Sequence, residues 1–297
     1  MKNSHRDLLL LPFLKTILLA VLMTSSIAWS ATLPNANPVP GGIAIIPLEK
    51  VENSTQPDVY FNNSKVMVLE QDHEWYAVVG IPLEFSPGKH SLEWDKPSGK
   101  LTISFTVKTK EYETQHLTIK NKRKVNPNKK DLKRIKKETV KIRAALQHWT
   151  NQSTIQTRFI LPVEGRLSSP FGLRRFFNGQ PRKPHSGLDI AAPRGTPIKS
   201  PADGKVIATG NFFFNGNTVF LDHGQGLITM YCHMDHIDVK PGQMVKQGEP
   251  IGAIGMTGRV TGPHVHWSVS LNDARIDPSL FFSDRALAKL ENPVEKK

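Results

Sequence analysis

Between Gly42 and about Lys120 the chain alternates short apolar runs with turn residues. The apolar runs are Ile43–Ile46, Lys65–Leu69, Trp75–Val79 and Leu101–Val107. Proline and glycine stand between the later runs, as in Pro87-Gly88 and Pro97-Ser98-Gly99. Short strands broken by frequent turns are typical of small antiparallel β-sandwiches. The pattern predicts an N-terminal β-domain over residues 42–125, and this region holds no cluster of residues with evident catalytic chemistry.

A helical period follows in residues 126–150. Residues that recur at helical spacing are Leu132, Ile135, Thr139, Ile142 and Leu146. Asn126-Pro127 resembles a helix N-cap followed by proline at the first helical position. Residues 120–143 include twelve Lys or Arg, opposed only by Asp131 and Glu138. We predict a basic linker helix whose cationic face either makes peripheral contact with anionic wall polymer or membrane, or is simply solvated.

Short β-runs return from Phe159 to about Phe282, together with frequent glycine. Examples are Lys205–Ala208, Thr218–Leu221, Leu227–Tyr231 and His264–Val269. This second β-domain, residues 159–282, holds six of the eleven histidines, and a C-terminal tail of residues 283–297 follows it. The expected fold class is therefore all-β: an N-terminal small β-sandwich, a linker helix and a C-terminal antiparallel β-sheet domain.

The first thirty residues have the pattern of a secretory signal peptide. Lys2 and Arg6 form a basic start, and the stretch from Leu8 to Ile27 is mostly apolar. Ala28 and Ser30 supply the small residues of a cleavage site. We expect export across the inner membrane to the periplasm, the cell envelope or the outside of the cell; an uncleaved membrane anchor is the alternative.

Composition narrows the class of partner. The chain has 297 residues, a formal net charge of +13 and a pI near 9.8, so acidic partners are favoured. Nucleic acid is not expected, because a secreted chain without interleaved aromatics lacks the usual features of such a surface. The lone cysteine, Cys232, cannot form an internal disulfide and is expected in a buried strand.

Three segments of the second β-domain carry candidate chemistry: His185-Ser186-Gly187-Leu188-Asp189, Tyr231-Cys232-His233, and Thr261-Gly262-Pro263-His264-Val265-His266. Residues two apart on a strand share a face. We therefore expect His264 and His266 on one face of their strand, and Tyr231 and His233 on one face of theirs. A catalytic zinc site uses three protein ligands and one open position, and two imidazoles with one carboxylate suit it. A helical H-E-x-x-H site is excluded, because His73-Glu74 has no second histidine at that spacing.

In their order along the chain these segments resemble the lysostaphin/LytM-type zinc metallopeptidases, a family of peptidoglycan endopeptidases. The resemblance covers roughly residues 160–282. It includes Ser169-Pro170-Phe171-Gly172, Gly195-Thr196-Pro197, Gly216-Asn217-Thr218-Val219, Asp222-His223-Gly224, Gly258 to His266 and Ile276-Asp277-Pro278. It implies one Zn²⁺ held by His185, Asp189 and His266, with His233 and His264 as catalytic histidines. Residues 42–125 are similar to the β-domain of some Gram-negative members, which can cover the active-site groove.

The resemblance implies a secreted endopeptidase that cleaves the peptide cross-links between peptidoglycan stems. We expect a D,D-endopeptidase that uses zinc-activated water. Tyr231 is a candidate to line the cleft or to sit in the core. Arg174 is a candidate to meet substrate carboxylates, or to be an exposed residue with no such role. Two other functions stay open: a non-catalytic regulator of a cell-wall amidase, and a secreted glycyl-glycine endopeptidase toxin.

Overall fold

A computed structural model describes residues 32–49, 56–96 and 98–291. The predicted signal peptide and the end of the C-terminal tail lie outside the described residues. Within the described part of the chain, no helix combines the length and the apolar character needed to cross a membrane.

The N-terminal region is a sandwich of two antiparallel sheets, which confirms this part of the predicted fold class. One sheet has the order β1(Ile43–Pro47), β5(Glu74–Gly80), β4(Met67–Gln71). The other has the order β3(Ser64–Lys65), β2(Asp58–Phe61), β6(Gly88–Lys96), β7(Gly99–Val107). Alternating side chains of the two sheets bury a shared apolar core that includes Val59, Val79, Leu92 and Trp94.

The segment that leaves the sandwich joins the second domain before the linker helix begins. Its strand β8(Thr114–Leu117) pairs in parallel with β10(Arg174–Phe177), which also pairs with β11(Gln180–Pro181). A short 3₁₀ turn, η1(Lys122–Lys124), follows β8. A segment distant in sequence is thereby fixed beside the start of the second domain.

The linker helix α1 spans Lys129–Leu146 and begins later than predicted. Its N-cap is Asn128, which forms a capping box with Asp131, so the predicted cap at Asn126-Pro127 is wrong. Ala145 and Leu146 are buried against the C-terminal sheet. Leu132, expected on the packed face, is 53% exposed. The helix therefore packs mainly through its C-terminal half.

The C-terminal domain is built on an antiparallel sheet, as predicted. Its main path has the order β17-β14-β15-β16-β19-β12-β9, with β13, β18 and β20 paired at its sides. The strands are β9(Arg166–Ser169), β12(Leu188–Ala191), β13(Pro197–Lys199), β14(Gly204–Phe212), β15(Gly216–Asp222), β16(Ile228–Ile237), β17(Met244–Val245), β18(Pro250–Ile254), β19(His264–Leu271) and β20(Ala274–Ile276). The 3₁₀ turn η2(Pro278–Phe281) and helix α2(Asp284–Glu291) complete it.

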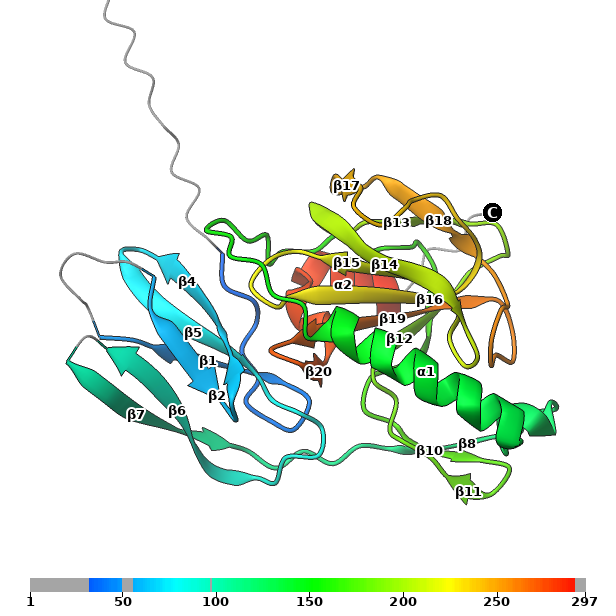
Figure 1. Ribbon diagram of the computed structural model, residues 1–297, viewed down its shortest axis with the longest axis horizontal. Helices are drawn as coiled ribbons and strands as arrows, with labels where there is room; N and C mark the ends of the chain where they lie inside the picture. Colours follow the sequence, from blue (N-terminus) through cyan, green and yellow to red (C-terminus); the bar gives the residue numbers. More distant parts are fainter. Residues whose placement is uncertain (1–31, 50–55, 97, 292–297) are drawn as a thin grey trace, which may run out of the picture.

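The two β-domains share an apolar core. Met67, Leu69 and Val78 of the sandwich belong to the same buried cluster as Val269 and Leu271 of the C-terminal sheet. Figure 1 shows the sandwich beside the C-terminal sheet, with α1 lying along that sheet. The face of the β1-β5-β4 sheet opposite its own partner sheet is thus covered by the second domain.

Candidate metal centre

Two neighbouring strands and one loop bring the candidate ligands together. Asp189 on β12 lies directly opposite His266 on β19 in the antiparallel register. Opposed residues have Cβ atoms about 5 Å apart, close enough for their side chains to meet. His185 lies in the loop that enters β12 and is almost completely buried.

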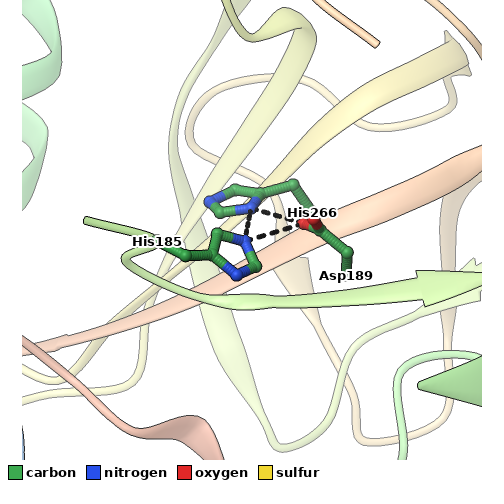
Figure 2. Close-up of side chains that lie close together, drawn as sticks. All are labelled: His185, Asp189 and His266. Carbon is green, nitrogen blue, oxygen red and sulfur yellow. Dashed lines mark hydrogen bonds and ion pairs between the residues drawn. The ribbon is translucent and has the colours of Figure 1, made fainter. Parts of the chain in front are cut away.

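The three side chains converge on one point (Figure 2). His185 Nε2 lies 2.9 Å from Asp189 Oδ1 and 2.9 Å from His266 Nδ1. His266 Nδ1 lies 2.8 Å from Asp189 Oδ1. One ligand atom from each residue can therefore face a single metal ion. The first and third of the segments singled out in the sequence meet here.

The three candidate ligand atoms face one another with too few N–H donors between them, and a cation would satisfy their lone pairs. His185 Nδ1 lies 2.7 Å from the Pro170 carbonyl, which can only accept, so this nitrogen carries the proton. In a neutral His185 ring, Nε2 is then a lone-pair acceptor facing the carboxylate of Asp189. Burial lowers the pKa of His266 to about 4, which favours its neutral ring. Acceptor atoms gathered in this way fit a metal ion such as Zn²⁺, which takes nitrogen and oxygen ligands.

Asp189 has a second, fixed partner. Its Oδ1 faces the two histidines, while its Oδ2 accepts a hydrogen bond from Arg175 Nη2 at 2.8 Å. Burial by itself would raise the pKa of Asp189, but its close contacts with His185 and His266 outweigh burial and hold the pKa well below its usual range. Asp189 is thus ionised and oriented for ligation.

Two further histidines flank the cluster. The ring centroid of His233 lies 4.9 Å from that of His264 and 6.2 Å from that of His266. His233 Nδ1 is held by the Thr257 carbonyl and His264 Nδ1 by the Gly262 carbonyl, each at 2.8 Å. His264 Nε2 is 3.9 Å from Asp189 Oδ1. Burial, followed by the nearby His264 and His266, lowers the pKa of His233 well below its usual value.

All five of these residues line one groove of about 470 Å³. Its apolar lining includes Leu117, the last residue of β8, and Ile119 and Val125 from the segment between β8 and α1. No described residue of the strands β1 to β7 lines this groove. In this structure the connecting segment, not the sandwich itself, borders the candidate site.

Of the two alternatives for Tyr231, the structure supports the core and contradicts the cleft. Tyr231 is fully buried in the core, and its hydroxyl lies 2.9 Å from Thr229 Oγ1. Strand alternation predicts His233 on the same face, but His233 has φ of +64°, in the left-handed region. This local break in β16 turns the His233 side chain into the groove while Tyr231 stays in the core.

For Arg174 the structure supports the second alternative, an exposed residue, and contradicts a place in the groove. Arg174 is exposed on β10 and does not line the groove, whereas its neighbour Arg175 does. Alternation along β10 puts the two side chains on opposite faces. Arg175 was not predicted from the sequence. The pairing of β10 with β8 decides which of the two arginines faces the site, and this pairing is not visible in the sequence.

Cys232 is buried in β16, as expected. Burial raises the pKa of its thiol to about 12, so a thiolate is strongly disfavoured at neutral pH. His223 is buried outside the site, with Nδ1 2.7 Å from the Asp203 carbonyl. Neither residue contributes to the groove.

Family models and a solved structure that resemble this chain all point to one family. Residues 183–278 match the model of peptidase family M23, and residues 36–110 match the model of the peptidase family M23 N-terminal domain. A crystal structure of a peptidase M23 protein from Pseudomonas aeruginosa is 44% identical, with a TM-score of 0.70, covering 83% of this chain and 96% of that one.

Curated relatives match somewhat more than a third of the chain. The chain is 43% identical over 113 residues to the peptidoglycan DD-endopeptidase ShyA of Vibrio cholerae, covering 38% of this chain and 26% of ShyA. It is 40% identical over 116 residues to the DD-carboxypeptidase/endopeptidase Mpg of Neisseria gonorrhoeae, covering 39% of this chain and 27% of Mpg. The matched segment therefore spans about a quarter of each relative.

Proposed function

Because the chain belongs to peptidase family M23, we propose that it is a zinc-dependent endopeptidase that hydrolyses the peptide cross-links of bacterial peptidoglycan, acting as a D,D-endopeptidase. The observation that carries the proposal is the convergence of His185 Nε2, Asp189 Oδ1 and His266 Nδ1 on one point beside two further histidines. The relatives named as DD-endopeptidases support the bond type.

In this proposal His185, Asp189 and His266 hold one Zn²⁺. When bound, the ion lowers the pKa of its water and polarises the scissile carbonyl. His233 and His264 each have Nδ1 held by a backbone carbonyl, which leaves Nε2 as the nitrogen that can exchange protons. One of them accepts the proton of the attacking water, and the leaving amine takes a proton back. His233 is buried and His264 is half-buried in the wall of the groove.

The proposal includes export. The pattern of residues 1–30 supports secretion across the inner membrane, which would bring the groove to its substrate in the periplasm or cell envelope. The basic segment 120–143 stays a predicted site of peripheral contact with anionic wall polymer or membrane.

The test is digestion of purified Gram-negative sacculi with residues 31–297, with and without a zinc chelator. Mass spectrometry of the muropeptides should show chelator-sensitive loss of cross-linked dimers and a matching gain of monomers. Zinc-loaded protein that yields no products would contradict the proposal. Stimulation of a cell-wall amidase by such inactive protein would instead support the regulator, and cleavage confined to glycine bridges would support the toxin.

A further inference from the structure

The groove beside the candidate metal centre carries an unbalanced positive charge. Its described lining residues include five cationic side chains but one carboxylate, Asp189. The cations are Arg175, Arg182, Lys183, Arg259 and Arg275. Of these, Arg175 alone forms an ion pair with a carboxylate among the described residues, and that carboxylate is Asp189 itself. A bound metal ion would add further positive charge, so the groove favours an anionic ligand.

Arg259 is held in place by two aromatic rings and by a tight turn of the backbone. Its guanidinium carbon lies 4.7 Å from the ring centroid of Phe177 and 4.4 Å from that of Phe214. Its backbone N–H donates to the Phe214 carbonyl at 2.8 Å. The preceding Gly258 has φ of +82°, and a Cβ there would come within 2.4 Å of the same carbonyl oxygen. The turn therefore fixes both the backbone and the side chain of Arg259.

The hydrogen-bonding capacity of Arg259 is almost unused. A guanidinium has five N–H donors, and the only acceptor that Arg259 contacts among the described residues is the Lys124 carbonyl, at 3.5 Å. Burial, followed by repulsion from Arg175 and Arg182, lowers the pKa of Arg259 to about 10. The side chain stays charged at neutral pH, yet it has lost part of its hydration without gaining an anionic partner.

The neighbouring arginines are occupied differently. Arg175 is committed to Asp189, and Arg182 Nη2 donates to neutral acceptors, the nearest being Gln180 Oε1 at 2.7 Å. Arg275 also has donors to spare, since its buried Nε has no hydrogen-bond partner among the described residues. Arg259 combines spare donors with a guanidinium that is held between two aromatic rings. Planar carboxylates match the forked donors of arginine and form strong, charge-assisted hydrogen bonds with them.

We propose that Arg259 forms a subsite for a free carboxylate of the substrate, in the groove that also contains the candidate metal centre. This inference rests on the proposed function and deepens it: the preferred substrate is a cross-linked peptide with an unamidated carboxylate close to the scissile bond. Arg259 acts as a specificity-determining residue, because a carboxamide at the same position would lack the charge that the clamped guanidinium requires.

The test compares two synthetic cross-linked peptides of one sequence, with a free carboxylate or a carboxamide on the residue beside the scissile bond. The zinc-loaded full chain should cleave the carboxylate form with a kcat/KM about tenfold higher or more, the usual scale for a lost charge-assisted hydrogen bond. Arg259→Gln should bring this ratio close to one. Arg259→Lys, which keeps the charge but loses the fork, should give an intermediate ratio. Arg285→Gln, on the exposed surface of α2, is the matched control for net charge and should keep the full ratio.

Equal cleavage of the two peptides by the unmodified protein would overturn the subsite, and so would an unchanged preference in a folded Arg259→Gln protein. If zinc-loaded protein cleaves neither peptide, the proposed function fails, and calorimetric binding of the same peptides then decides on the subsite. A tenfold tighter binding of the carboxylate form that Arg259→Gln abolishes would support it. Equal affinities would overturn it.

Discussion

Each histidine of the site has one ring nitrogen tied to a fixed partner. In His185, His233 and His264 this nitrogen is Nδ1, held by a backbone carbonyl. In His266 it is Nε2, which lies 3.0 Å from Ser268 Oγ. Such outer partners fix the orientation of a ring and which of its nitrogens faces the site. His266 consequently presents Nδ1 to the cluster, whereas His185 presents Nε2.

The two histidines of the His-x-His segment should therefore separate in experiment. His266→Ala removes a candidate ligand, so we expect loss of stoichiometric zinc and of activity. His264→Ala leaves the three-residue cluster intact, so zinc should stay bound while turnover falls by about 10²–10⁴-fold, the usual contribution of a proton-transfer group. Zinc content and muropeptide release measured on the same samples check both. Near-normal turnover in His264→Ala would remove that residue from the catalytic scheme.

Arg175 should matter for metal affinity although it is not a candidate ligand. Its hydrogen bond to Asp189 Oδ2 fixes the carboxylate whose other oxygen faces the cluster. Loss of such an outer partner typically weakens metal binding by about 10- to 100-fold, and we expect this for Arg175→Gln. The measurement is a zinc competition titration against a chromophoric chelator. Arg174→Gln is the matched control, and equal effects of the two substitutions would contradict the role given to Arg175.

At the scale of the elements, local sequence patterns were sufficient to predict a strand where that strand is regular and has one buried face. The runs starting at Ile43, Lys65 and Thr218 all lie in or overlap strands of the structure. The face of a side chain was mispredicted at Tyr231, because the positive φ of His233 interrupts the alternation. The parallel pairing of β8 with β10 joins residues sixty positions apart, and no local period encodes such a contact.

The start of α1 offers a direct test at this scale. Asn128 Oδ1 accepts the Asp131 N–H at 2.9 Å, and Asp131 faces back toward the Asn128 N–H. Loss of an asparagine N-cap costs about 1 kcal/mol of the free energy of unfolding, so Asn128→Ala should destabilise the protein by that amount. Asn126→Ala, at the position the sequence favoured, should have a clearly smaller effect in urea denaturation. The reverse order would return the cap to Asn126.

At the scale of the whole molecule, the sandwich and the C-terminal domain are joined by polar contacts as well as by the shared core. Asn272, in the turn between β19 and β20, accepts the Gly80 N–H at 2.7 Å and donates to the Gly80 carbonyl at 3.0 Å. Gln225 Oε1 accepts the Val68 N–H at 2.9 Å. These buried contacts reach the central strand β5 and the edge strand β4 of that sheet of the sandwich. They favour a fixed arrangement of the two domains over a sandwich that swings onto the groove.

Removal of the Asn272 side chain should therefore weaken the whole molecule rather than one turn. Asn272 has φ of +43°, which glycine adopts without strain, so Asn272→Gly isolates the loss of the two interdomain hydrogen bonds. Unpaired buried backbone groups at Gly80 should lower the free energy of unfolding by about 1–3 kcal/mol. Asp273→Gly is the matched control: it lies in the same turn at φ of +64° but forms neither bond. Calorimetry should show one cooperative unfolding transition for the unmodified protein and for both variants, at a lower temperature for Asn272→Gly. Two separate transitions in the unmodified protein would mean that the domains unfold independently. In that case the shared core does not couple them.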